Sequence, residues 1–160
     1  MNAEAKQKQY DRTRRQIMEL IEGETDVIAV MATVACELHH RFDHFHWTGF
    51  YRVVEPELLK IGPYQGLHGC LQIPFSKGVC GAAARSRQTQ VVPDVREFPG
   101  HIACSSTTRS EIVVPVTDSN GDLVAVLDID SDQVGAFDPI DTTNLERLCE
   151  MMGKIGPSQY

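Results

Sequence analysis

The first forty residues carry apolar side chains at the spacing of α-helices. Residues 3–22 are charged and end in Ile17, Met18, Leu20 and Ile21, which lie along one side of a helix. Residues 26–41 repeat this three- and four-residue spacing with a broader apolar stripe, made of Val27, Val30, Met31, Val34, Ala35 and Leu38. We therefore predict a covering helix followed by a more deeply buried helix.

From Trp47 onward the pattern is typical of short strands. Residues 47–54 are rich in aromatic and β-branched side chains, and Glu55-Pro56 ends them. Turn-forming Gly62-Pro63 and Gly66 separate the next two predicted strands. The elements expected after the first strand are strands at 58–61 and 70–75, a helix at 78–87, a strand at 89–92 and a long loop at 94–110.

The strongest local signal is a hairpin near the C-terminus. Residues 111–116 and 123–129 are apolar strands joined across a turn that contains Asn120-Gly121. Asp138 and Pro139 then have the order of a helix cap and a first helical residue, which predicts a helix over 139–153. Because strand-helix-strand repeats are lacking, we predict an α+β fold whose central, mostly antiparallel sheet is flanked by helices.

Length and composition favour one domain. The chain has 160 residues, of which 42% are hydrophobic and 23% are charged, as in globular proteins. We expect a single domain over residues 1–160. Its parts are N-terminal helices within 3–41, a sheet with its site-bearing loops within 47–131, and a C-terminal helix at 139–153.

Charge and hydropathy exclude several classes of partner. The formal net charge is −7, which argues against binding the phosphate backbone of a nucleic acid. Charges interrupt the apolar runs well before the roughly 18–20 residues that a membrane span requires. The N-terminal residues lack the apolar segment of a signal peptide. We therefore expect a cytoplasmic protein that binds neither nucleic acid nor membrane.

Five cysteines raise the question of thiol chemistry. Cys36 and Cys149 lie on predicted helices and are expected to be small buried hydrophobic residues. Cys104 lies in the irregular loop, where a thiol can be exposed, whereas Cys70 and Cys80 lie at the edges of predicted elements. A disulfide from Cys104 to either of these two is one interpretation, and an ordinary core containing all three is the other. The cysteine spacing does not match a structural zinc site, so we predict no metal.

Three carboxylates fall on the hairpin strands. Glu111 begins one strand, and Asp128 and Asp130 share a face of the other because side chains alternate along a strand. Buried like charges repel, so these groups require a cation or a hydrogen-bonding partner. They predict either a pocket that binds an ammonium group and holds one carboxyl protonated, or simply a strand end that runs into solvent.

Two aromatic residues share a strand face. Trp47 and Tyr51 are four residues apart, so they could wall a small apolar slot or simply belong to the core. His101 stands beside Pro99-Gly100, where it could orient the loop or influence a thiol, although this context is more typical of an ordinary hydrogen-bonding residue.

Several motifs together resemble one family. They are GPYQG at 62–66, Cys70 followed by IPFSKGVCG at 73–81, FPGHIAC at 98–104, SEIVVP at 110–115, and GDLVAVLDIDS at 121–131. In this order and with these three cysteines, they resemble the free methionine-(R)-sulfoxide reductases, which are stand-alone GAF domains. The resemblance extends from Trp47 to the final helix and implies a GAF fold.

The resemblance also implies roles for individual residues. Cys104 would be the nucleophile, Cys70 the favoured resolving thiol, and Cys80 an auxiliary or alternative one. Trp47 and Tyr51 would hold the methyl-sulfoxide end of free methionine sulfoxide. The amino group would be bound by the carboxylates, which would also assist protonation: Glu111, Asp128 and Asp130. Thioredoxin would recycle the enzyme, no metal or organic cofactor would be needed, and the fold is compatible with a homodimer.

Two positions depart from the family pattern. Ser105 stands where an Asp commonly follows the catalytic Cys, and Tyr64 stands where Phe is usual. The first departure removes a local acid but leaves the thiol chemistry intact.

The alternative function is a GAF-type ligand sensor without catalysis; such sensors are normally joined to output domains, for which this chain has no room. Replacing Cys104 by Ser separates the two functions, because only a reductase would lose activity.

Overall fold

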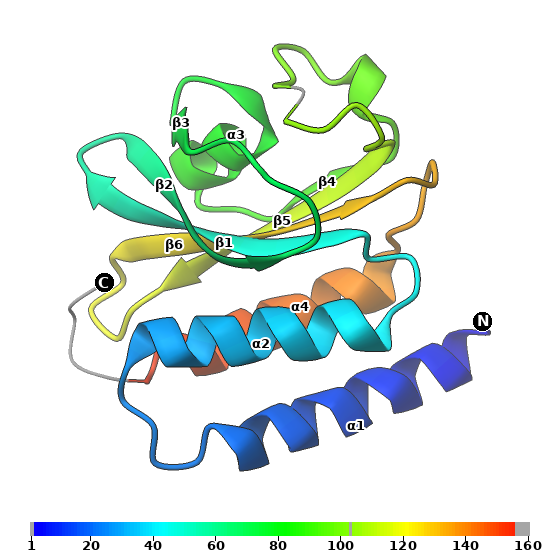
Figure 1. Cartoon of the computed structure of the whole chain (residues 1–160), viewed down its shortest axis with the longest axis vertical. Helices are drawn as coiled ribbons and strands as arrows, with labels where there is room; N and C mark the ends of the chain where they lie inside the picture. The colour runs from blue at the N-terminus through cyan, green and yellow to red at the C-terminus, as the bar shows by residue number, and fades with distance from the viewer. Residues whose placement is uncertain (1, 103, 156–160) are drawn as a thin grey trace.

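A six-stranded antiparallel sheet forms the centre of the protein (Figure 1). The computed structural model describes residues 2–102 and 104–155. The strand order is β3-β2-β1-β6-β5-β4, and every neighbouring pair is antiparallel. The strands are β1 (Trp47–Glu55), β2 (Leu58–Gln65), β3 (Gln72–Pro74), β4 (Gln90–Val92), β5 (Ser110–Thr117) and β6 (Leu123–Ser131). The predicted α+β fold with a flanked antiparallel sheet is confirmed.

Four helices and a 3₁₀ turn surround the sheet, and side-chain caps fix where most of them begin. They are α1 (Ala3–Leu20), α2 (Val27–Arg41), α3 (Gly78–Ser86), η1 (Val95–Glu97) and α4 (Pro139–Met152). The side chains of Asn2 and Asp26 accept hydrogen bonds from the first turns of α1 and α2. Asp138 and Asp141 form a capping box at α4, with Pro139 in the first turn as expected.

The two faces of the sheet are covered differently. Helices α2 and α4 pack directly on one face, and α1 lies across them as an outer layer (Figure 1). This side holds the larger apolar core, which includes Phe50, Leu127 and Leu145. On the opposite face, α3 and the loops cover a second core that includes Trp47, Tyr51 and Cys80. The cysteines and acids proposed above therefore meet on the α3 face.

The expectation that Gly62-Pro63 forms a turn is wrong. Both residues lie inside β2, at a register irregularity in its pairing with β1. The outer neighbour β3 pairs only with Leu58, Leu59 and Lys60. Pro63 therefore has no strand beside it on that side, and its missing N–H removes no hydrogen bond to β3. The strand expected at 70–75 is likewise shortened to β3, which places Cys70 in the preceding loop.

The hairpin and the long loop agree with expectation. Strands β5 and β6 pair around a turn in which Gly121 has a φ of +84°, the conformation that glycine adopts most readily. The segment between β4 and β5 is irregular except for η1, which begins at the Asp94 cap. None of the described helices is long and apolar enough to cross a membrane.

Candidate active site

The acidic side chains are aligned by the register of three central strands. Asp130 on β6 pairs with Trp47 on β1 and with Glu111 on β5. Two residues earlier on β6, Asp128 pairs with Gly49 on β1. Directly opposed residues project to the same face of a sheet, so all these side chains project towards α3. The registry brings together groups that lie far apart in the sequence.

An aromatic cluster adjoins the acids on β1. The rings of Trp47 and Tyr51 stack at a centroid distance of 5.9 Å, and Tyr64 stacks on Trp47 at 5.4 Å. Gly49 is required here, since a Cβ at this position would lie 2.6 Å from Cη2 of Trp47 and 2.4 Å from Cβ of Tyr64. Gly69 in the β2–β3 loop also lies close to Trp47 and Tyr51: a Cβ at this position would be crowded, because it would lie 3.0 Å from the Tyr51 hydroxyl oxygen.

Cys70 and Cys104 form a disulfide bond that joins two loops. Their Cα atoms lie 5.3 Å apart, and 34 positions separate them in the sequence. Both residues are partly exposed. Of the two pairings that the sequence left open, this structure contains Cys104 with Cys70, while Cys80 is a free thiol buried beneath them.

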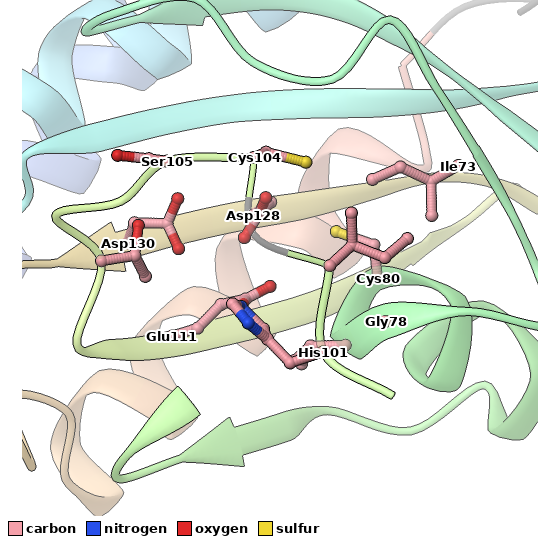
Figure 2. Close-up of a pocket in the computed structure, with 12 residues that line it drawn as sticks. Ile73, Gly78, Cys80, His101, Cys104, Ser105, Glu111, Asp128 and Asp130 are labelled. Atoms are coloured by element: carbon pink, nitrogen blue, oxygen red, sulfur yellow. The ribbon is translucent and has the colours of Figure 1, made fainter. Parts of the chain in front are cut away.

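A small cavity lies between α3, the Cys104 loop and the acidic strand face (Figure 2). Its volume is about 30 Å³. The lining residues are Ile73, Gly78, Val79, Cys80, His101, Ile102, Cys104, Ser105, Thr108, Glu111, Asp128 and Asp130. Five of the proposed site residues thus share one cavity. Trp47 and Tyr51 are fully covered and do not contribute to this lining.

Burial keeps protons on the carboxyl groups. Glu111 and Asp128 are each only 6% exposed. Burial raises the pKa of Glu111, Asp128 and Asp130 well above its usual range, and repulsion between neighbouring carboxylates raises it further. The Thr108 hydroxyl donates to Asp130. Asp128 is hydrogen-bonded with Glu111 and Cys80, while its Oδ1 has no partner among the described residues. The alternative of a strand end running into solvent is therefore wrong.

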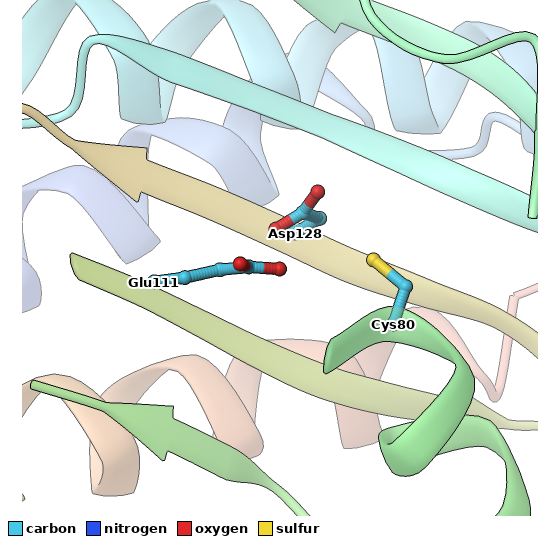
Figure 3. A group of neighbouring side chains, drawn as sticks. All are labelled: Cys80, Glu111 and Asp128. Carbon is cyan, nitrogen blue, oxygen red and sulfur yellow. The ribbon is translucent and has the colours of Figure 1, made fainter. Parts of the chain in front are cut away.

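Cys80 extends the acidic cluster from α3. Its sulfur and one carboxylate oxygen each of Glu111 and Asp128 all lie within 4.8 Å of one another (Figure 3). Burial, reinforced by the neighbouring Asp128 carboxyl group, raises the pKa of the Cys80 thiol well above its usual range. One sulfur and two oxygen ligands are a donor set that Zn²⁺ accepts, but binding would first have to displace these protons.

His101 also lines the cavity, which its sequence context alone did not indicate. Nε2 of His101 lies 3.7 Å from Oε2 of Glu111, and both residues line the cavity. Burial lowers the pKa of His101, so its neutral form faces the protonated acid. The signal was its position three residues before Cys104, within the segment that folds over the cavity.

The two helical cysteines lie away from the cavity. Cys149 is buried in the larger core, as expected. Cys36, however, is only partly buried, and its sulfur lies 3.7 Å from Nδ1 of His40 on the next turn of α2.

Comparison with known proteins identifies the family of this fold. Residues 23–155 match the GAF domain family. The chain is 42% identical to "GAF domain-containing protein A" of Dictyostelium discoideum over 92% of both chains. It is 38% identical to the free methionine-R-sulfoxide reductase of Escherichia coli, with 91% of this chain and 87% of the relative covered.

A solved structure shows the same fold. The free methionine-R-sulfoxide reductase of Neisseria meningitidis in complex with its substrate is 42% identical and superposes with a TM-score of 0.86. The match covers 90% of this chain and 86% of that one. The chain therefore belongs to the GAF-domain family and, within it, to the free methionine-R-sulfoxide reductases.

Proposed function

We propose that this protein reduces free L-methionine-(R)-sulfoxide to methionine, with residues 1–160 acting as one GAF domain. The observation that carries the proposal is that Cys104, bonded to Cys70 in a disulfide, lines a cavity together with three carboxyl groups. The identity to relatives named for this reaction supports the substrate and the epimer. Thiol exchange with an external reductant requires a reducing compartment, for which we propose the cytoplasm.

The first step is attack by the Cys104 thiolate on the sulfoxide sulfur. A protonated carboxyl group donates its proton to the sulfoxide oxygen, and the oxygen passes to the cysteine sulfur. Methionine is released and Cys104 becomes a sulfenic acid, so the substrate sulfur gains the two electrons that the cysteine loses. No metal or organic cofactor takes part in this step.

The second step forms the disulfide. The thiol of Cys70 attacks the sulfenic sulfur of Cys104, and the oxygen leaves as water. Thioredoxin or another dithiol then returns both cysteines to thiols. The favoured resolving cysteine is Cys70 because it is bonded to Cys104 here, and the buried Cys80 would be auxiliary.

The carboxyl groups have two tasks in this proposal. The substrate ammonium would lower the pKa of the carboxyl that it contacts, so Asp128 would release its proton to solvent and pair with the ammonium group; its Oδ1 has no partner among the described residues. A carboxyl that stays protonated would serve as the acid, and its raised pKa suits this role. Because neutral carboxyls do not repel a thiolate, the raised pKa values also spare the Cys104 thiolate from an anionic environment.

The aromatic pair would bind the other end of the substrate. Trp47 and Tyr51 would contact the methyl-sulfoxide group, and Gly49 leaves the space that the indole ring occupies. A residue within a peptide has no free amino group to pair with buried carboxyls. Free methionine sulfoxide would therefore be preferred over the peptide-bound form.

The decisive experiment measures turnover with dithiothreitol on both epimers of free methionine sulfoxide. We expect reduction of the R epimer alone, and loss of more than about 10³-fold in kcat on Cys104→Ser. Cys36→Ser is the matched control, since Cys36 lies on α2 away from the cavity, and it should retain full activity. A wild-type protein that binds the amino acid without turnover would replace this proposal with a ligand sensor.

A further inference from the structure

The segment that carries Cys70 lacks carboxylate, lysine and arginine side chains. Between Lys60 and Lys77 the chain contains no Asp, Glu, Lys or Arg, although 23% of all residues are charged. This interval includes the loop from Gly66 to Leu71, which connects β2 to β3. The loop itself therefore carries no acidic side chain, and its one basic side chain is the imidazole of His68, in a protein whose net charge is −7.

Two leucines on this loop are unusually exposed. Leu71 is 74% and Leu67 is 72% exposed, the highest values among the large hydrophobic side chains of the described residues. Single exposed apolar residues are common, but these two lie on either side of a disulfide-bonded cysteine. They add nothing to either core, so folding alone does not account for them.

The loop backbone is held in place while these side chains face solvent. Nε1 of Trp47 donates to the carbonyl of Leu67 at 2.8 Å, and the backbone N–H of Ile61 donates to the carbonyl of Leu71 at 3.0 Å. The leucine side chains are therefore presented on a fixed support. Preorganised apolar side chains lose little conformational freedom when a partner binds them.

Disulfide exchange dictates where a reductant must touch this protein. A thiolate attacks one sulfur of the disulfide and expels the other, so its own surface must lie against the residues around the attacked sulfur. Attack on the Cys70 sulfur places the reductant on the uncharged loop and releases the Cys104 thiolate, which is the proposed nucleophile. The second thiol of the reductant then attacks the mixed disulfide and frees Cys70, so two electrons pass from the dithiol to the protein.

We infer that Leu67 and Leu71 form the docking surface for a protein dithiol whose reactive cysteines lie in an apolar, uncharged patch. The inference rests on the proposed function and specifies how the same site is recycled. A small thiol needs no such surface, because it can reach the partly exposed sulfurs without contacting the leucines. Docking and chemistry can therefore be measured separately.

The test compares two reductants on the same variants. With thioredoxin, thioredoxin reductase and NADPH, the double variant Leu67→Ser/Leu71→Ser should raise the KM for thioredoxin about tenfold or more. With dithiothreitol its turnover should equal that of the wild type. Leu20→Ser is the matched control, since Leu20 is 56% exposed at the end of α1, and it should change neither value.

The outcomes separate this inference from the function on which it rests. An unchanged KM for thioredoxin, or an equal loss with both reductants, would overturn the docking surface while leaving the reductase intact. A wild-type protein without turnover in dithiothreitol would overturn both. As a second readout, a thioredoxin lacking its resolving cysteine should be trapped on Cys70, and trapping on Cys104 would contradict the inference.

Discussion

Two acidic clusters lie on opposite sides of the sheet, and they differ in whether the chain supplies a cation. On the helical side, Lys6 of α1 pairs with Asp138 at 2.9 Å and with the fully buried Asp141 of α4. The Tyr10 hydroxyl donates to the other oxygen of Asp141 at 2.7 Å. This cluster fastens the outer helix α1 to α4, and its buried carboxylate is fully partnered.

On the α3 side, Glu111, Asp128 and Asp130 have no lysine or arginine partner among the described residues. Their charge is suppressed instead by protonation, as the raised pKa values indicate. The comparison teaches that burial of an acid alone does not mark a site. A binding site is indicated by a buried acid that has no cationic partner within the protein and can therefore pair with a cationic ligand.

The largest expected effect is on catalysis. Asp128→Asn keeps the shape of the side chain but removes the acid, so kcat/KM should fall about 10²–10⁴-fold. The melting temperature should not fall, because Asp128 is not fastened to a cation. Asp132→Asn, an exposed acid just beyond β6, is the control and should retain activity. If Asp128→Asn and Glu111→Gln both keep wild-type turnover and affinity, the assignment of these acids is wrong.

The opposite result is expected on the helical side. Lys6→Met leaves Asp141 buried without its cation, so unfolding should become easier by about 3–5 kcal/mol. Urea unfolding measures this loss, and turnover per folded molecule should stay unchanged. Lys8→Met is the matched control, since Lys8 pairs with Glu4 on the exposed side of α1, and it should cost less than about 0.5 kcal/mol. Equal stability of the two variants would mean that the buried pair contributes nothing.

A smaller loss should follow from the hydroxyl of the same cluster. Tyr10→Phe preserves the ring that packs against Phe42 but removes the donor to Asp141, which should cost about 1.5–3 kcal/mol. Thermal unfolding at neutral pH is the appropriate measurement. Tyr64→Phe, at a ring that is 37% exposed, should change stability by less than about 0.5 kcal/mol. If Tyr10→Phe lowers stability by as little as Tyr64→Phe, a water molecule has replaced the hydroxyl as the donor to Asp141.

The smallest effect concerns pH, and its sign differs between the two clusters. A raised native pKa means that the folded protein binds more protons than the unfolded chain, so the α3-side acids lower stability as pH rises above about 4. The pKa of Asp138 is lowered by its bond to Lys6, so its contribution is lost as pH falls. Asp128→Asn should reduce the decline of stability with pH by up to about 1.4 kcal/mol per unit. Parallel wild-type and variant profiles between pH 5 and 8 would argue against a protonated Asp128.

Local signals in the sequence were sufficient for much of the fold. Asn120-Gly121 predicted the β5–β6 turn, and Asp138-Pro139 predicted the start of α4, because turn and cap chemistry acts within a few residues. The misread segment was Gly62-Pro63, since whether proline fits a strand depends on where the neighbouring strand ends. That information is not local.

The individual residues of the site were predictable from the sequence, but the strand register and the disulfide that bring them together were not. Strand alternation placed Asp128 and Asp130 on one face, whereas their alignment with Glu111 depends on strand register. The residue pattern left both Cys70 and Cys80 as candidates for bonding to Cys104, because loop closure has no periodic signature, and only the family resemblance favoured Cys70. His101 was undervalued for the same reason, since only folding brings it to Glu111.

The bond between Cys70 and Cys104 also limits what the protein can hold. With the bond closed, the cavity measures about 30 Å³, far below the roughly 150 Å³ of a protein cavity that holds one benzene molecule. An amino acid does not fit, so the two bridged loops must separate before it enters. Occupancy and oxidation state are therefore thermodynamically linked: a ligand that binds only the dithiol form makes the bridge easier to open, and closing the bridge expels the ligand.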